Sequence, residues 1–353
     1  MKILLLAESL DPRSGWGAYA HALAGTLRAA GEEVTVLTAH GSSDGPHLPD
    51  QHASWFRWRL AEFRLHRWLS QRQYDVVHVT AEVYAQLFRA WGSTPFVVTV
   101  HGTYADPDAY PAYATRTRAA FHAAQTLVAV SAWTRSRVPR EFQEKVQVIP
   151  NGVDMDIADE PFDAAPAHGR PLVLSVGAIK PRKGLDRLIA GFAEFQKTHP
   201  EAELVIIGRV DRPDVQHALV RQANDLGLAD HVRFAGEVSR RALLGWFRAC
   251  DVFVLTPVTD GGYEGFGLVY LEANVFGKPC VGSRDSGARD SIQEGKNGFL
   301  AEPNDPADIA RAIDRAYSLS PESVQQTMNG CDWKSRAHEY RDLYGKCRST
   351  PSR

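Results

Sequence analysis

Short apolar runs alternate with helix-like segments along the chain, and this alternation constrains the fold more than any other feature. Ile3 to Ala7 indicates a buried strand, Ala18 to Ala30 a helix that ends at Gly31, and Val34 to Thr38 the next strand. Strands that are apolar throughout are typical of parallel sheets with helices on both faces. We therefore expect an α/β fold built from βαβ units.

The alternation is interrupted once, near the middle of the chain. Residues 154–170 are rich in Asp, Ala and Pro and show little periodicity, which is typical of a crossing between domains. A second βαβ series opens at Leu172 to Val176. The chain has 353 residues, enough for two α/β domains. We expect an N-terminal domain over residues 1–160, a C-terminal domain over 170–320 and a final helical segment over 321–353.

Composition and charge argue against several classes of protein. A formal net charge of -2 and a pI near 6.7 do not fit a general nucleic-acid binder. The four cysteines lie far apart without metal-ligand spacing, which favours a reducing, cytoplasmic compartment. The apolar run at Ile3 is too short for a signal peptide, and no segment approaches the ~18 apolar residues of a membrane span. We expect a soluble, cytoplasmic protein without a cofactor or a bound metal.

The stretch from Glu264 to Pro279 carries the strongest site pattern. It follows a strand-like run and a glycine-containing loop over residues 260–262, and it turns helical after Gly267. A helix N-terminus presents free backbone amides and a partial positive charge, which suits a phosphate group. Glu264 precedes this helix and Glu272 lies one turn inside it, so both carboxylates can accept hydrogen bonds from a hydroxylated ligand. The spacing predicts a sugar-nucleotide site.

A second loop between a strand and a helix is rich in cations. Lys180, Arg182 and Lys183 fall within four positions after the predicted strand at Leu172 to Val176. Lysine offers a diphosphate a point charge, and arginine offers it a fork of donors. A solvated charge cluster is the alternative, but the adjacent helix start favours phosphate binding.

Two further loops follow predicted strands of the first half. Gly15 and Gly17 precede the first helix, so backbone could approach a ligand there, although a tight turn explains them equally well. Ala20 breaks the dinucleotide pattern G-x-G-x-x-G, and we do not expect NAD binding. His101 directly follows the apolar run Phe96 to Val100, where open α/β sheets bind ligands. A capping or loop histidine is equally possible.

Residues 55–72 interleave aromatic and basic side chains, with Glu62 as the only acid among them. Trp58, Ala61, Leu65 and Trp68 fall on one helical face, and an amphipathic helix rich in Arg and Trp can lie in an anionic lipid interface. The alternative is a surface helix packed on the sheet, with arginine stems covering apolar area. The sequence slightly favours the packed helix and leaves peripheral contact with the inner membrane face open.

Taken together, the motifs resemble the retaining glycosyltransferases of GT-B architecture, in the large family-four type with two glutamates separated by seven residues. The resemblance covers nearly the whole chain. It rests on an ordered set of motifs: Gly15-Trp16-Gly17, His101-Gly102, Ile149 to Asp154, Lys183-Gly184, Glu264 with Glu272, Gly287 with Asp290, and Asp332-Trp333 with Tyr340 and Tyr344.

The resemblance implies two Rossmann-like domains facing across a cleft, with the nucleotide sugar on the C-terminal domain, the acceptor on the N-terminal one and the last helix crossing back. It implies a catalytic role for His101, Glu264 and Lys183. The implied donor-binding residues are Gly17, Arg182, Lys183, Gly208, Phe266, Gly267, Leu268 and Glu272. Trp16, Tyr19 and Tyr104 are candidate acceptor contacts because aromatic rings stack on sugars, although core packing is at least as plausible for Tyr19.

The chemistry that the resemblance implies is transfer of a glycosyl group from a GDP- or UDP-linked sugar to a hydroxyl of a sugar, lipid-linked or small-molecule acceptor, with retention. Because the N-terminal loops show no obvious nucleophilic carboxylate, we favour a same-face mechanism without a metal, in which Lys183 and helix amides stabilise the leaving group. Two positions depart from the family pattern: Ala178 replaces a frequent arginine, and Asp290 a frequent glutamate. A nucleotide-sugar epimerase, a phosphorylase and a non-catalytic nucleotide-sugar binder remain alternatives.

Overall fold

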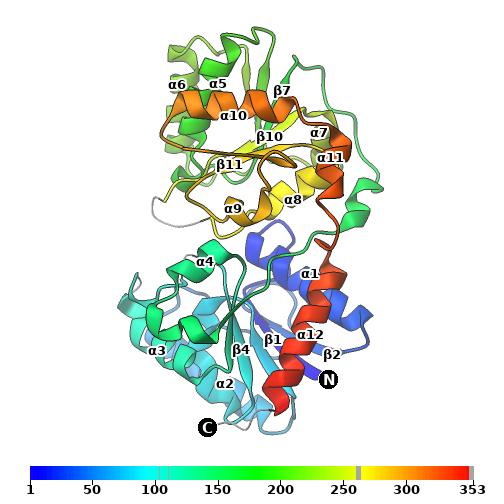
Figure 1. Ribbon diagram of the computed structural model, residues 1–353. Helices are drawn as coiled ribbons and strands as arrows, with labels where there is room; N and C mark the ends of the chain where they lie inside the picture. The colour runs from blue at the N-terminus through cyan, green and yellow to red at the C-terminus, as the bar shows by residue number, and fades with distance from the viewer. Residues whose placement is uncertain (103, 110, 260–263, 350–353) are drawn as a thin grey trace. The chain divides into compact units, whose positions relative to one another are not determined.

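The computed structural model describes residues 1–102, 104–109, 111–259 and 264–349, and the chain divides into two compact units (Figure 1). The first unit comprises Met1–Gly152 and the C-terminal segment from Trp333, and the second comprises Val153–Asp332. Each unit is built on a six-stranded parallel sheet, which confirms the expected α/β class. The glycine-containing loop expected at residues 260–262 lies outside the described residues.

The sheet of the first unit has the strand order β2-β1-β3-β4-β5-β6. Its strands are β1 (Lys2–Ala7), β2 (Glu33–Thr38), β3 (Val76–Val79), β4 (Phe96–Val100), β5 (Thr126–Ala129) and β6 (Val146–Val148). The helices are α1 (Gly15–Ala29), α2 (Trp55–Leu69), α3 (Pro111–Ala123), α4 (Ala132–Arg137) and α12 (Trp333–Ser349), with the 3₁₀ segments η1 (Glu82–Trp91), η2 (Pro107–Ala109) and η3 (Arg140–Lys145). The strand order reverses between β1 and β3, and such switch points are where open α/β sheets bind ligands.

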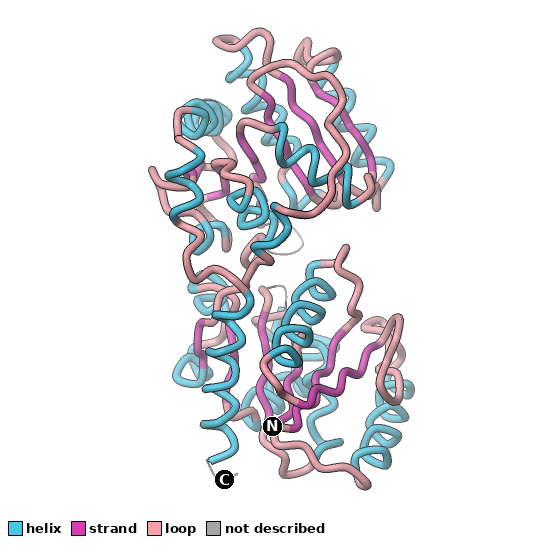
Figure 2. Tube along the Cα trace, turned by 90° about the vertical axis from the view of Figure 1, so that its right-hand side faces the viewer, coloured by secondary structure: helices cyan, strands magenta, loops and turns pink. Residues whose placement is uncertain are grey.

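Alternate residues of these strands bury opposite faces of the sheet, as the pleat requires. Leu4 and Leu6 pack with α2, η1 and α3, whereas Ile3 and Leu5 pack with α1 and α12. Figure 2 shows the helices on both sides of the strands. On the second of these faces, a buried polar network fixes α12. The hydroxyl of Tyr340 lies 2.6 Å from that of Tyr19, and the hydroxyl of Tyr344 lies 2.6 Å from Nδ1 of His78.

The sheet of the second unit has the order β12-β11-β10-β7-β8-β9. Its strands are β7 (Leu172–Val176), β8 (Glu203–Ile207), β9 (Val232–Gly236), β10 (Val252–Leu255), β11 (Cys280–Ser283) and β12 (Gly298–Ala301). The helices are α5 (Leu185–Gln196), α6 (Pro213–Asp225), α7 (Arg240–Ala249), α8 (Leu268–Val275), α9 (Ala288–Ser291), α10 (Pro306–Tyr317) and α11 (Pro321–Gln326), with 3₁₀ segments η4 (Met155–Ala158) and η5 (Pro181–Lys183). Here the switch point lies between β7 and β10.

Two apolar layers cover this second sheet. One contains α5, α6 and α10 against alternate residues such as Val173 and Leu204, and the other contains α7, α8 and α9 against Leu172 and Leu174. The loops that follow β7 and β10 therefore emerge side by side at the carboxyl edge of the sheet.

Several elements differ from the sequence-based expectation. The first helix begins at Gly15 because Ser14 caps it by accepting a hydrogen bond from Gly17. The segment between β3 and β4, which the alternation of strands and helices would make an α-helix, is the 3₁₀ segment η1. Most of its residues are buried, so packing against its neighbours determines its path more than helical periodicity does. Among the described residues, no helix combines the length and the apolar character that crossing a lipid bilayer demands.

Candidate active site

The switch point of the second unit brings together three residues that the sequence places in separate motifs. The loop after β7 carries Arg182 and Lys183, and the loop after β10 carries Glu264. Lys183 Nζ lies 2.6 Å from Oε2 of Glu264, and Nη1 of Arg182 lies 2.9 Å from the same oxygen. The two cations thus converge on one carboxylate at the edge where a parallel sheet binds its ligands.

This cluster is largely shielded from water. The side chains of Lys183 and Glu264 are 12% and 14% exposed, respectively. Burial on its own would raise the pKa of Glu264, but Lys183 and Arg182 outweigh it and hold this pKa below its ordinary value. Burial lowers the pKa of Lys183, and the Glu264 carboxylate opposes that effect. With Glu264 ionised and both partners charged, the cluster carries a net positive charge suited to an anion.

Helix α8 begins beside this cluster in sequence and leaves its first turn open. Gly267 stands at the N-cap with φ of 80°, and no side chain caps the helix. A Cβ on Gly267 would lie 2.5 Å from the Tyr270 ring, so a side chain there would clash as well as strain the backbone. Phe266 is buried, and its carbonyl accepts a hydrogen bond from Ser291 at 3.0 Å. The Tyr270 amide donates to the Gly267 carbonyl at 3.0 Å, whereas the amides of Leu268 and Val269 form no hydrogen bond in the described part of the chain and are available to an anion.

Glu272 lies one turn inside α8 and has no hydrogen-bond partner among the described residues. Burial raises the pKa of Glu272, and Arg240 opposes this rise. A half-buried carboxylate with unused acceptor sites is suited to bind hydroxyl groups. No hydrogen bond or ion pair in the described part of the chain joins Glu272 to Lys183 or Glu264.

Two other residues of this edge have different surroundings. Lys180 forms an ion pair with Asp211 at 2.8 Å, so of the three loop cations it is Arg182 and Lys183 that contact Glu264. Gly208 follows β8, and a Cβ there would lie 1.9 Å from the carbonyl oxygen of Gly177. Gly208 therefore allows two strand-end loops to touch. The structure shows this packing role directly.

In the first unit, His101 is held at the carboxyl end of β4. Its Nε2 lies 2.8 Å from the carbonyl oxygen of Thr80, which only accepts, so Nε2 carries the proton and Nδ1 keeps its lone pair. Burial lowers the pKa of His101 to about 4. The imidazole is therefore neutral at physiological pH and can accept a hydrogen bond.

Glu82 is a residue of this site that sequence reasoning missed. It is fully buried, and its Oε1 accepts hydrogen bonds from the backbone amides of His101 at 2.7 Å and Gly102 at 3.3 Å. Burial raises the pKa of Glu82 to about 7, although the backbone donors oppose the rise. A carboxylate three residues after the end of β3 was the available signal, because parallel sheets gather polar side chains at this edge.

The three aromatic acceptor candidates divide into two kinds. The half-buried rings of Trp16 and Tyr104 lie 6.0 Å apart, and Trp16 lies 6.3 Å from the His101 ring. Tyr19 is only 1% exposed and packs edge-on against His101 at 4.8 Å, while its hydroxyl bonds to Thr99 and Tyr340. Tyr19 thus packs in the core against His101, which is the core-packing alternative given for it above.

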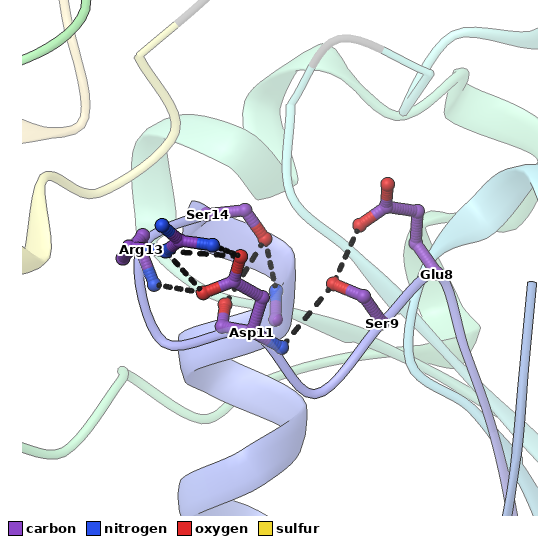
Figure 3. A network of polar contacts seen from close by, with 6 residues as sticks. Glu8, Ser9, Asp11, Arg13 and Ser14 are labelled. Atoms are coloured by element: carbon purple, nitrogen blue, oxygen red, sulfur yellow. Dashed lines mark hydrogen bonds and ion pairs between the residues drawn. The ribbon is translucent and has the colours of Figure 1, made fainter. Parts of the chain in front are cut away.

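The loop between β1 and α1 is stiffened by its own polar contacts (Figure 3). Asp11 binds the Arg13 guanidinium at 2.8 Å, and Ser14 Oγ accepts from the amide of Gly17 at 3.0 Å. A Cβ on Gly17 would lie 2.2 Å from the carbonyl oxygen of Asp11, so this tight packing explains the glycine. The predicted site residues accordingly form two groups, one in each unit.

Two Rossmann-like sheets, each with polar residues gathered at its carboxyl edge, define a two-domain α/β protein of the nucleotide-binding type. Two protein families match the chain, each over about half of its length. Residues 156–332 match the family described as glycosyl transferases group 1, and residues 13–157 match glycosyltransferase family 4. The chain belongs to this glycosyltransferase family, and the GT-B architecture expected from the resemblance is confirmed.

Relatives and solved structures agree with this assignment. A GDP-mannose-dependent alpha-(1-6)-phosphatidylinositol monomannoside mannosyltransferase of Mycolicibacterium smegmatis is 30% identical, over 73% of this chain and 72% of its own. A D-inositol 3-phosphate glycosyltransferase of Acidothermus cellulolyticus is 32% identical, over 69% of this chain and 59% of its own. Sucrose-phosphate synthase from Thermosynechococcus elongatus shares the fold, with a TM-score of 0.80, 19% identity and 98% of each chain covered.

Proposed function

We propose that the chain is a retaining hexosyltransferase that moves a sugar from a GDP- or UDP-linked donor to a hydroxyl acceptor in the synthesis of a cell-surface glycan, glycolipid or glycoside. The observation that carries the proposal is the convergence of Arg182 and Lys183 on Glu264 beside the open first turn of α8. Cations and free amides suit a diphosphate, and carboxylates suit sugar hydroxyls. The M. smegmatis relative uses GDP-mannose, and a solved Anabaena structure of this fold contains UDP and glucose.

In this proposal the diphosphate of the donor replaces the Glu264 carboxylate as the counter-ion of Lys183 and Arg182. The Glu264 carboxylate, released from these ion pairs, accepts hydrogen bonds from the transferred sugar. Glu272 holds the ribose hydroxyls, while the backbone of Phe266, Gly267 and Leu268 receives the phosphate and sugar. As the resemblance implies, we also place Gly208 beside the nucleotide and Gly17 beside the diphosphate. Arg182 supplies a second cation, which offsets the absence at Ala178 of the arginine that is frequent in the family pattern.

The reaction breaks the bond between the anomeric carbon and the diphosphate oxygen, and the bonding electrons leave with that oxygen. The acceptor hydroxyl attacks the same face, forms the new glycosidic bond and passes its proton to the departing phosphate. Lys183, Arg182 and the α8 amides stabilise the charge that accumulates on the leaving group, as preorganised donors do. These groups serve the purpose of a metal ion, so the reaction is metal-independent. We place the neutral imidazole of His101 against the donor sugar.

We assign the acceptor to the first unit and the nucleotide sugar to the second. Trp16 and Tyr104 offer half-buried aromatic surface to a sugar, lipid-linked or small-molecule acceptor, and Tyr19 supports His101 from behind. Cys250, Cys280, Cys331 and Cys347 form no disulfide in the described part of the chain, which fits the reducing cytoplasm where we propose that the enzyme works.

The test is product analysis with UDP- and GDP-sugars and a panel of hydroxyl acceptors, with the anomeric configuration read by proton NMR. We expect a glycoside with the donor's anomeric configuration. A glycoside of inverted configuration would overturn the retaining mechanism. Conversion of the donor to an epimerised nucleotide sugar without acceptor would indicate an epimerase, sugar phosphate formed from a glycoside and inorganic phosphate a phosphorylase, and tight donor binding without turnover a sensor.

A further inference from the structure

The outer face of α2 is unusual for a helix that packs on a sheet. Trp58, Leu65 and Leu69 turn inward and join the core of the first unit. Four other apolar side chains of the same helix remain in water: Trp55 is 71% exposed, Phe56 67%, Phe63 63% and Leu60 36%. The inward face accounts for packing on the sheet, and the outward residues are not needed for it.

The outward residues form a continuous stripe. Phe56, Leu60 and Phe63 are spaced by four and three positions, so they lie in a row along one side of the helix. Arg67 continues this row by one more turn, and Trp55 stands at its N-terminal end, where the Arg59 guanidinium lies 6.0 Å from its ring. We define this outer stripe as Trp55, Phe56, Leu60 and Phe63.

Arginines flank the stripe and keep their positive charge. Arg57, Arg64 and Arg67 are exposed and form no ion pair in the described part of the chain. The only acid of the helix, Glu62, is buried on the inward side, where it binds Arg59 at 3.0 Å and Arg116 at 2.7 Å. No negative charge of α2 therefore offsets the outward arginines.

We propose that the outer stripe of α2 inserts into the interface of an anionic lipid bilayer. Helices that lie in this interface combine a bulky apolar face, which enters the acyl boundary, with basic residues, which contact anionic headgroups. The positive charge beside the outer stripe favours an anionic bilayer over a second copy of the chain as the binding partner. A two-fold contact between two outer stripes would place the same arginines against one another and would oppose pairing. The proposal is independent of the reaction, because no residue of the candidate active site lies on α2.

Vesicle flotation of the full chain tests the proposal. We expect it to float with vesicles of phosphatidylethanolamine and phosphatidylglycerol, to bind vesicles of phosphatidylcholine much more weakly, and to lose binding as salt screens the headgroups. Failure to float with the anionic vesicles would overturn the proposal, as would equal binding to the neutral ones. A soluble chain that self-associates through this face would instead assign the surface to a second copy.

Two sets of variants separate the apolar and the charged contributions. Phe56→Ala with Phe63→Ala should lower the partition coefficient by about tenfold or more, because two large side chains no longer leave water. Arg57→Gln, Arg64→Gln and Arg67→Gln together should lower it on the order of a hundredfold, at about fivefold for each charge near an anionic surface. All five side chains are exposed, so the fold should persist, as circular dichroism would verify.

The chain offers a matched control for each set. Tyr317→Ala removes an aromatic side chain that is 43% exposed on α10, and Arg221→Gln removes an exposed cation on α6. Both substitutions lie in the second unit and should leave flotation unchanged. A decrease in the controls equal to that in the α2 variants, or undiminished flotation of both α2 variants, would refute a role for the outer stripe.

Discussion

At the scale of single residues, the pair of cations on Glu264 has the most direct consequences for turnover. Lys183→Ala removes a buried charge from the proposed leaving-group site, and Glu264→Gln removes the carboxylate proposed to hold the sugar. Each should lower turnover at least tenfold, about 1.4 kcal/mol in the barrier. Steady-state kinetics on variants whose folding is verified by thermal unfolding would measure this effect.

The control for this prediction is Lys197→Ala, which breaks the ion pair of an exposed lysine with Glu194 at the end of α5. Its turnover should match that of the unsubstituted chain. Full activity of purified Lys183→Ala or Glu264→Gln would show that the site lies elsewhere.

The buried carboxyl of Glu82 predicts a dependence of stability on pH. Its pKa is raised from 4.5 to about 7 in the folded chain, so the folded state binds the proton more tightly than the unfolded state. The unfolding free energy should therefore fall as the pH rises from about 5 to 7, by up to about 3 kcal/mol from this one group. Below the unfolded pKa and above the folded one, Glu82 should contribute no slope.

Urea unfolding of the unsubstituted chain and Glu82→Gln across this pH range would measure the difference. Glutamine keeps an oxygen for the amides of His101 and Gly102 but does not titrate. The unfolding free energy of the variant, relative to that of the unsubstituted chain, should therefore increase as the pH rises. Parallel curves would contradict the prediction.

The sequence indicated which residues would bear the site, but not how they pair. Glu264 lies 81 and 82 positions after its two partners, and their meeting depends on the neighbouring places of β7 and β10 in the sheet. Strand order is not contained in hydrophobic periodicity, so the ion pairs could not be derived. Glu82 was missed for a related reason, since its partners are backbone amides of a loop that follows another strand.

At the scale of secondary-structure elements, the start of α8 is the most sensitive point. Gly267→Ala would force a side chain into a left-handed conformation and against the Tyr270 ring. We expect a loss of about 1–2 kcal/mol in unfolding free energy from the backbone alone. The displaced first turn should also weaken donor binding. Chemical denaturation and donor titration would measure the two effects.

Gly345→Ala is the matched control, because Gly345 lies within α12 and a Cβ there meets no atom within 4 Å. Alanine at that exposed helical position should stabilise the chain slightly, by about 0.5–1 kcal/mol. Equal effects of the two substitutions, or unchanged donor binding in Gly267→Ala, would argue against a special role of the α8 N-terminus.

The elements themselves could be predicted where burial imposes a clear pattern. Parallel strands buried on both faces are uninterrupted apolar runs, and Phe96–Val100 and Leu172–Val176 have the predicted bounds. Helix α3 was not predicted, because Pro111–Ala123 mixes Ala, Thr and Arg without a distinct apolar stripe. For α2, the apolar face predicted from Trp58, Ala61, Leu65 and Trp68 packs on the core, as in the slightly favoured alternative, and does not meet lipid. The separate outer stripe became visible only once the orientation of the helix was known.

At the scale of the whole molecule, the proposed reaction requires no divalent cation. Lys183, Arg182 and the α8 amides provide the positive charge that a metal ion would bring to the diphosphate. Turnover should therefore be unchanged after treatment with EDTA and dialysis, measured against an untreated sample. Activity that disappears with EDTA and returns with Mn²⁺ would contradict this reasoning.

The central claim is that the switch point of the second unit holds the diphosphate of a nucleotide sugar. A thermal-shift screen with UDP-, GDP-, ADP- and TDP-sugars tests it most directly, since a ligand that binds the folded chain raises its melting temperature. At least one donor should stabilise the unsubstituted chain and Lys197→Ala, and the shift should be lost in Lys183→Ala. The absence of a shift with every donor, or an equal shift in Lys183→Ala, would contradict the account.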